Sequence, residues 1–172
     1  MEYHELIRKR FSVRKYKEDR LTAGQIDEIL MAGNVAPTAR DLQPQRIYVL
    51  ESKESMEKLS EAIGPMLFGA PNAFIICADR TEASPLPFRD EGNFGETDAT
   101  IVTTHMMLAA HDLGLGTCWI GYFDPKVLRE SFDIPENEDI YHILIVGTPA
   151  DDCAPGPLHA KRKTLASTVR II

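Results

Sequence analysis

Cysteine is scarce in this chain, and its three cysteines form no recognisable pattern. Cys77, Cys118 and Cys153 include no CxxC pair and no paired spacing. An odd number of cysteines without a framework favours reduced thiols, as in cytosolic proteins. The N-terminus has no apolar stretch typical of a signal peptide, and no apolar run approaches the length of a membrane span. The sequence therefore predicts a soluble, cytoplasmic protein with no membrane partner.

Short motifs for nucleotides, metals and nucleophilic catalysis are also missing. The chain has no GxGxxG after an apolar strand, no GxxxxGK[ST], no GxSxG and no HExxH. His105 and His111 are six residues apart, so they fall on different faces of one predicted helix. We therefore expect no metal site, and we interpret Cys118 as a small core residue of a strand.

Positive charge is in deficit overall but concentrated locally. The net charge of −7 argues against a nucleic-acid partner, because phosphate polymers require a dominant basic field. An acidic protein with two basic clusters suits a small anionic ligand better, although a solvated charged surface is an equally good explanation of composition alone. The clusters are Arg8, Lys9, Arg10, Arg14, Lys15 and Lys17 near the N-terminus, and Lys161, Arg162 and Lys163 near the C-terminus.

Five segments have the apolar spacing of helices. Thr22 and Gln25 match a capping box, and Asp124 followed by proline is typical of a helix N-terminus. The helix over residues 97–112 is apolar on much of its circumference, which predicts a central or subunit-interface position. The five are residues 2–10, a segment opening at Thr22, residues 55–63, residues 97–112 and a segment opening at Asp124.

Strands alternate with these helices. The continuous apolar run over residues 73–78 is typical of a strand covered on both faces. Prolines and glycines interrupt residues 80–96, and a loop of that length in a compact domain is often a lid. The last ten residues look extended. We expect one domain over residues 1–172, with strands near 47–50, 73–78, 116–121 and 142–146.

Four segments, in order and spanning nearly the whole chain, resemble the motifs of the nitroreductase family of flavoproteins. Residues 10–14 (RFSVR) resemble its RRSxR motif, and residues 36–44 (APTARDLQP) its APSxxNxQPW segment. Residues 113–121 (LGLGTCWIG) are similar to its GLGTxWxG segment, and Arg162-Lys163 matches its closing basic motif. Each match alone is weak, whereas the ordered set is specific.

This resemblance implies an α+β fold with a central mixed or antiparallel sheet flanked by helices. It also implies an intertwined homodimer with FMN at the subunit interface and a C-terminal tail that crosses to the partner. NAD(P)H would deliver hydride to flavin N5, and a nitroaromatic, quinone or similar small acceptor would then take the electrons. No side chain is expected to be catalytic, because the flavin carries the chemistry.

The resemblance also assigns roles to particular residues. Arg10, Ser12 and the 161–163 cluster would hold the FMN phosphate, and Arg14 would lie near flavin N1 and O2. Backbone donors near Ile120 and Gly121 would face N5, while Thr38, Asp41 and Gln43 of the other subunit would touch the ribityl chain or pyrimidine. The candidate cofactor-binding residues are Arg10, Phe11, Ser12, Arg14, Pro37, Thr38, Ala39, Asp41, Gln43, Trp119, Ile120, Gly121, Lys161, Arg162 and Lys163.

The chain departs from the family pattern at two positions. Asp41 stands where Asn is usual, and a carboxylate cannot donate a hydrogen bond as Asn does. Gln45 stands where Trp is frequent. Two alternatives stay open: the same fold with another flavin reaction (flavin fragmentation, dehalogenation or a protein electron donor), and a non-catalytic FMN-binding protein.

Overall fold

The computed structural model describes residues 2–88 and 91–172. Four strands form one antiparallel sheet in the order β1-β2-β4-β3, which confirms the α+β class. The central pair, β2 and β4, has long apolar stretches, whereas β1 and β3 form the edges. The strands are β1 Gln45–Leu50, β2 Asn72–Asp79, β3 Gly116–Ile120 and β4 Glu138–Gly147.

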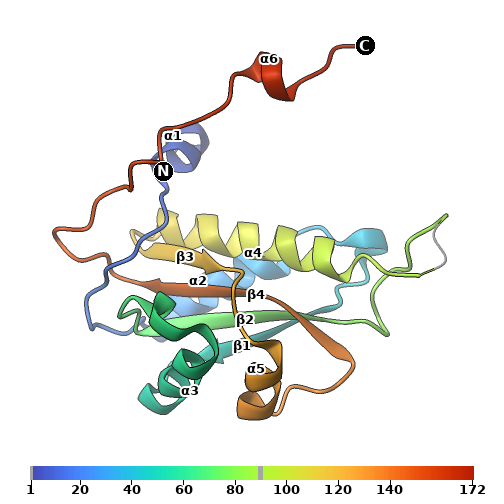
Figure 1. Cartoon of the computed structure of the whole chain (residues 1–172), viewed down its shortest axis with the longest axis horizontal. Coiled ribbons are helices and arrows are strands. Elements are labelled where there is room, and N and C mark those ends of the chain that lie inside the picture. Colours follow the sequence, from blue (N-terminus) through green and yellow to red (C-terminus); the bar gives the residue numbers. More distant parts are fainter. Residues whose placement is uncertain (1, 89–90) are drawn as a thin grey trace.

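Helices cover both faces of this sheet (Figure 1). Helices α2 (Ala23–Asn34) and α4 (Gly95–Asp112) lie on one face, and α3 (Lys53–Ile63) and α5 (Pro125–Phe132) lie on the other. The short helices α1 (Tyr3–Lys9) and α6 (Leu165–Thr168) lie apart from these layers, near the two termini. The core is therefore double, with one apolar layer on each side of the sheet.

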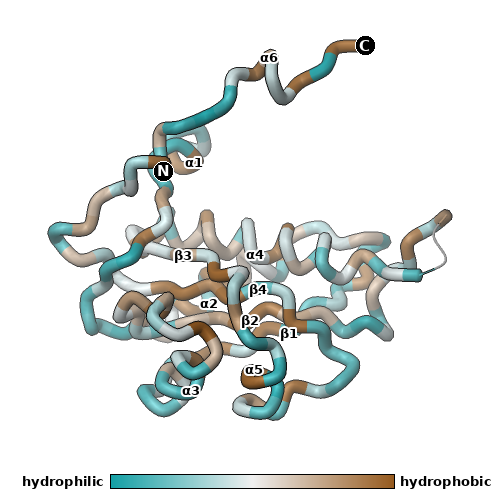
Figure 2. The backbone as a smooth tube through the Cα atoms, viewed as in Figure 1, coloured by the Kyte–Doolittle hydropathy of each residue, from teal (hydrophilic) through white to brown (hydrophobic). Residues whose placement is uncertain are grey.

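Alternation along the central strands divides the core into these two layers. Phe74 and Leu144 face α2 and α4, whereas Ile75 and Ile143 face α3 and α5, and all four are fully buried. Burying an aliphatic or aromatic side chain of this size contributes roughly 1.5–3 kcal/mol. Figure 2 shows the apolar colouring concentrated along the strands of the sheet.

The predicted helix ends are confirmed at the level of hydrogen bonds. The Thr22 hydroxyl accepts the Gln25 N–H at 3.2 Å, while the Gln25 side chain accepts the Thr22 N–H at 2.9 Å. The Asp124 carboxylate accepts the N–H groups of Lys126 and Val127, which caps α5. Both caps satisfy backbone donors that a helix leaves free at its N-terminus.

Three expectations need correction. The C-terminal tail is not fully extended, because Leu165–Thr168 forms α6. The last strand begins at Glu138 rather than near 142, and α4 begins at Gly95 rather than 97. Polar side chains at the start of β4 hide it from an apolar pattern. Their partners, such as Tyr48, whose hydroxyl donates to Glu138 at 2.6 Å, come from distant parts of the sequence.

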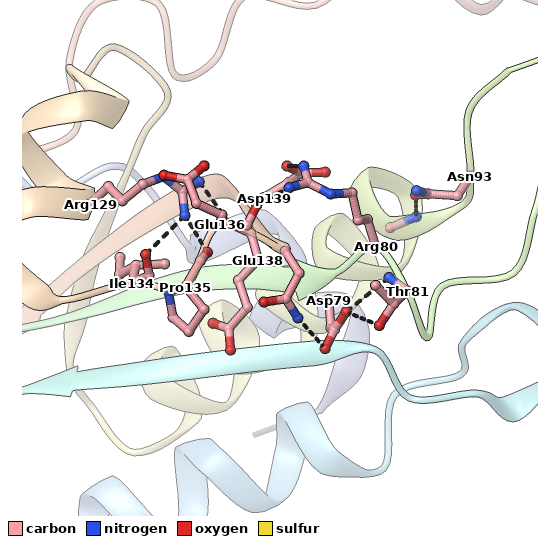
Figure 3. A network of polar contacts seen from close by, with 12 residues as sticks. Asp79, Arg80, Thr81, Asn93, Arg129, Ile134, Pro135, Glu136, Glu138 and Asp139 are labelled. Carbon is pink, nitrogen blue, oxygen red and sulfur yellow. Dashed lines mark hydrogen bonds and ion pairs between the residues drawn. The ribbon is translucent and has the colours of Figure 1, made fainter.

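A polar network organises the end of the sheet where β2 stops and β4 begins (Figure 3). The Arg129 guanidinium donates to the carbonyl oxygens of Ile134, Pro135 and Glu138. The Asp79 carboxylate accepts hydrogen bonds from Thr81 and Asn137. These bonds lower the pKa of the Asp79 carboxyl, the Thr81 hydroxyl most strongly. The network fixes loop geometry and leaves its charged groups mutually satisfied.

The predicted lid is a narrow hairpin beside the N-terminus of α4. Its arms are joined by hydrogen bonds from the Leu86 N–H to the Gly92 carbonyl and from the Phe94 N–H to the Ser84 carbonyl. The Asn93 side chain accepts the Gly95 N–H at 2.8 Å and so links the hairpin to the helix. Residues 89 and 90 of the predicted loop lie outside the described residues.

Candidate functional site

A pocket of about 410 Å³ lies where the segment after α1 meets the segment before α6. Five of its lining residues are Arg10, Phe11, Ser12, Arg14 and Arg162, all predicted cofactor residues. The remaining lining residues come from the C-terminal segment: Gly156, Pro157, Leu158 and His159. The structure therefore brings together the first and last of the four motifs, which are about 150 residues apart in sequence.

Edge strand β3 positions the N-terminal half of this pocket. The Val13 N–H donates to the Thr117 carbonyl at 2.9 Å, and the Tyr16 hydroxyl donates to the Val13 carbonyl at 3.0 Å. A Cβ at Gly116 would lie 2.5 Å from Cγ2 of Val13. Glycine is needed there because the side chains of Val13 and Pro149 pack directly against this position, so its small size has a cause within the chain.

The structure separates the N-terminal basic cluster into two classes. Lys15 and Lys17 form ion pairs with Asp152 and Asp151 on the outside of the molecule. Among the described residues, no carboxylate forms an ion pair with Arg10, Arg14 or Arg162. Three guanidinium groups thus face one pocket without a described counter-ion.

Electrostatics inside the pocket favour an anion. Burial lowers the pKa of Arg10, and the nearby positive charge of Arg162 lowers it further. Such mutual repulsion is relieved when a negatively charged ligand binds between the guanidinium groups. Guanidinium forks and a Ser12 hydroxyl together form the donor set that a phosphate group requires.

The second predicted segment, residues 37–43, forms a tight loop between α2 and β1. Three of its residues other than glycine have left-handed backbone angles: Arg40 (φ 58°), Asp41 (φ 56°) and Gln43 (φ 50°). The Thr38 hydroxyl accepts the Gln43 N–H at 3.1 Å. The Asp41 carboxylate accepts from the Gln43 side chain, also at 3.1 Å. Strained backbone of this kind persists only where surrounding bonds hold it.

The first turn of α4 anchors this loop. Asp98 is 1 % exposed, and its Oδ1 accepts the Ala39 N–H at 2.8 Å. Its other carboxylate oxygen is buried without a hydrogen-bond partner among the described residues. Burial raises the pKa of Asp98, and the bond from Ala39 opposes that rise.

The arginine pocket and the 37–43 loop lie at opposite ends of α4. The loop contacts Asp98 near the start of the helix, whereas the pocket borders β3, which follows the end of the helix. Asp98 lies 14 residues before Asp112, the last residue of α4, so these two points of the helix are about 21 Å apart. One chain therefore does not bring these two predicted groups around one small ligand.

The third predicted segment, at the end of β3, combines core and surface residues. The Trp119 ring packs edge-on against His142, with ring centroids 4.6 Å apart, on the α4 face of the sheet. Ile120 is buried on the opposite face. Gly121 is exposed, and a Cβ added there would meet no atom within 4 Å. Space for a ligand thus remains at Gly121 but not at Gly116.

The C-terminal motif contributes unequally. Arg162 lines the pocket, whereas Lys161 and Lys163 are exposed and do not line it. The motif comparison missed His159, whose ring packs edge-on against Phe11 with centroids 6.1 Å apart. The sequence feature that could have identified His159 is its position three residues before Arg162, in a basic stretch.

Fold and site together define an α+β protein with a pocket lined by three arginines and formed by its two terminal segments. The model of the nitroreductase family matches residues 7–71 and 62–148. The chain belongs to this family. A protein of Archaeoglobus fulgidus is 33% identical over 153 residues, which cover 86% of this chain and 85% of that protein. Its name refers to NADH dehydrogenase and NAD(P)H nitroreductase activities.

Solved structures agree with this assignment. A nitroreductase family protein from Clostridium difficile 630 has a TM-score of 0.91 at 35% identity, covering 99% of this chain and 98% of that one. An FMN-dependent nitroreductase from Clostridium difficile R20291 has a TM-score of 0.73 at 29% identity, covering 87% and 88% respectively. Within residues 2–88 and 91–172, no helix is long and apolar enough to cross a membrane.

Proposed function

We propose that this protein is an FMN-dependent NAD(P)H oxidoreductase. The observation that carries the proposal is the convergence of Arg10, Arg14 and Arg162 around Ser12, in a chain of the nitroreductase family. Relatives whose names include FMN and NAD(P)H support the cofactor and the co-substrate. When bound, FMN supplies a centre that accepts hydride from NAD(P)H and passes electrons to a second substrate.

The donor set of this chain fits FMN. The phosphate is a dianion, for which Arg10 and Arg162 offer charge-assisted hydrogen bonds and Ser12 offers a hydroxyl. The open space beside Gly121 would admit a flat ring close to the backbone. Lys161 and Lys163 would act on the phosphate at longer range, because both are exposed outside the pocket lining.

Arg14 is the residue that we assign to the flavin ring. It is exposed at the pocket, and its guanidinium has only a long hydrogen bond of 3.4 Å, to the Ser12 carbonyl. A positive charge near flavin N1 and O2 stabilises the anionic reduced form. We expect Arg14→Ala to weaken flavin binding or to slow reduction. Unchanged FMN affinity together with an unchanged reduction rate would refute this role.

We further propose that the active form is a homodimer with FMN between the subunits. Two features support this arrangement. The 37–43 loop and the arginine pocket are separated by the length of α4 within one chain, so a partner must supply one of them. The tail also exposes apolar side chains that one chain leaves uncovered: Leu165, Val169, Ile171 and Ile172. A groove beside edge strand β1, lined by Leu30, Met31 and Ile47, offers a complementary apolar surface.

The electron acceptor would be a nitroaromatic, a quinone or a similar small molecule, reduced in a ping-pong cycle. A cavity of about 370 Å³ between the 37–43 loop and the lid supports a small acceptor. Its lining includes Arg40, Pro87 and Phe94. Donor and acceptor would use the same space in turn, since each must approach the same ring.

The proposal is tested by recording the visible absorption spectrum of the purified protein and then adding NADH or NADPH under anaerobic conditions. A flavin band that bleaches with either nucleotide is the expected result. A band that persists would contradict NAD(P)H as the donor. It would leave two alternatives: a flavin carrier, or an enzyme that is reduced by a protein electron donor. Failure to bind added FMN would overturn the whole proposal.

A further inference from the structure

The arginine pocket contains one side chain of a type that changes charge near neutral pH. His159 lines it together with Arg10, Arg14 and Arg162. Guanidinium groups stay charged at all accessible pH values, whereas histidine ordinarily gains or loses its proton between pH 5 and 8. His159 is therefore the lining residue that can make anion binding depend on pH.

One ring contact and one backbone hydrogen bond position His159. It packs against Phe11 at an interplanar angle of 72°, so the neighbouring motif residue fixes its plane. Its backbone N–H donates to the Gly156 carbonyl at 2.9 Å, which closes the turn that carries it. The residue is half-buried, so an anion in the pocket would contact a partly desolvated imidazole. A side chain fixed in this way loses little rotamer entropy on binding.

The charged groups that face His159 are basic. Arg10 and Arg14 face it from the N-terminal segment, and Arg162 and Lys161 belong to its own segment. His111, in the last turn of α4, lies beyond Arg10, whose charge helps to lower the His111 pKa after burial. The described lining includes no carboxylate. A phosphate dianion bound among these groups would favour the charged form of an adjacent imidazole.

We propose that His159 is a further phosphate ligand of the flavin site, and that binding of a phosphate-bearing flavin is coupled to uptake of one proton from solvent onto its imidazole. The inference rests on the proposed function, since it takes FMN as the ligand. It goes beyond that proposal by predicting that low pH strengthens the phosphate contact. The proton moves from water to the ring nitrogen, and no covalent bond to the flavin changes.

The test measures the Kd of FMN and of riboflavin, which lacks the phosphate, for wild type and His159→Gln at pH 6.5 and 8.5. Glutamine keeps a neutral donor but cannot carry charge. The FMN-over-riboflavin preference should fall about tenfold in the variant at pH 6.5 and much less at pH 8.5. Titration of the phosphate itself is common to both proteins, so the comparison isolates His159.

Calorimetry in buffers of different ionisation enthalpy gives a second readout. Wild type should take up more protons on binding FMN than on binding riboflavin, and His159→Gln should lose most of this excess. His159→Lys, which is always charged, should keep the preference at both pH values. His4→Gln, an exposed histidine on α1, is the matched control and should behave as wild type.

Two results would overturn the proposal while leaving FMN binding intact. One is an equal pH dependence of the FMN preference in wild type and His159→Gln. The other is loss of that dependence in His111→Gln instead, which would assign the proton to the histidine beyond Arg10. Failure of wild type to bind either flavin would overturn the proposed function and this inference together.

Discussion

The arginine pocket and the 37–43 loop are the two predicted cofactor-binding regions, and their side chains are held in different ways. The pocket is lined by like charges that repel one another, and burial with nearby Arg162 lowers the pKa of Arg10. The loop is internally satisfied, since Asp41, Gln43 and Thr38 bond to one another and Ala39 bonds to Asp98. We therefore expect the pocket to be stabilised by a bound anion, whereas the loop is preorganised by its own chain.

This difference predicts which changes affect binding and which affect stability. A substitution in the pocket removes a ligand contact but relieves repulsion, so it should cost affinity more than folding stability. A substitution around the loop breaks a hydrogen bond that holds the loop, the part-buried bond from Ala39 to Asp98 most importantly, so it should cost stability first. Substitutions in the two regions therefore separate the effect on FMN affinity from the effect on folding stability.

The largest effect is expected from Arg10→Ala. Loss of a buried, charge-assisted contact to phosphate costs about 1.5–3 kcal/mol, or about 10- to 100-fold in FMN affinity. Titration of flavin fluorescence measures it. Arg8→Ala, an exposed arginine at the end of α1, is the control and should retain wild-type affinity. Equal losses in both variants would mean that the pocket attracts FMN only through general charge.

Glycines at the two ends of β3 should respond differently. In Gly116→Ala the new methyl group meets Val13 and Pro149, so we expect a loss of about 1–3 kcal/mol in the free energy of unfolding. Gly121→Ala meets no atom of its own chain and should preserve stability while weakening FMN binding. Urea unfolding and FMN titration of both variants check this. Weakened stability in Gly121→Ala, with unchanged affinity, would contradict the open site.

Asp98→Asn should change how stability depends on pH. Burial raises the pKa of Asp98, so the folded carboxyl holds its proton more tightly than the unfolded one. The free energy of unfolding then falls as pH rises from the unfolded pKa, about 4, through the folded pKa. The Asn variant lacks this fall, so its stability relative to wild type should increase from pH 4 to 7. A constant difference between the free energies of unfolding of the two proteins across that pH range would contradict this prediction.

The smallest effect is expected from Lys17→Ala. The ion pair with Asp151 is exposed and screened by solvent, so its loss should change the free energy of unfolding very little. FMN affinity should not change, because Lys17 does not line the pocket. A clear loss of affinity would show that the whole N-terminal basic cluster acts on the ligand.

Local patterns predicted much of the fold. The caps at Thr22 and Asp124 depend on residues within one turn, and the buried strand near 73–78 depends on a short apolar run. The start of β4 at Glu138 was missed, because the partners of Glu138 come from other elements: its carboxylate accepts from Tyr48 and its backbone carbonyl from Arg129. Long-range partners leave no trace in a local pattern.

The same limit applies to the site. Ordered motifs identified Arg10, Ser12 and Arg162, and the structure places all three in one pocket. The sequence could not show that Lys15 and Lys17 pair with Asp152 and Asp151, nearly 140 residues away. Nor could it show that Gly116 is required by Val13 rather than by a ligand. Both facts depend on long-range contacts that the N-terminal segment makes with β3 and with the segment after β4.

A mixed dimer tests the central claim, that each flavin lies between the pocket of one chain and the loop of its partner. One chain would carry Arg10→Ala, and the other chain would carry the double substitution Thr38→Ala and Gln43→Ala, with a different affinity tag on each chain. Each homodimer would first be shown to bind FMN poorly. If the site is shared, one of the two sites in the mixed dimer has no substitution, so it should bind about one FMN per dimer with wild-type affinity. If both halves came from the same chain, each site would carry one defect. The mixed dimer would then bind FMN as poorly as its parents, which would contradict the account.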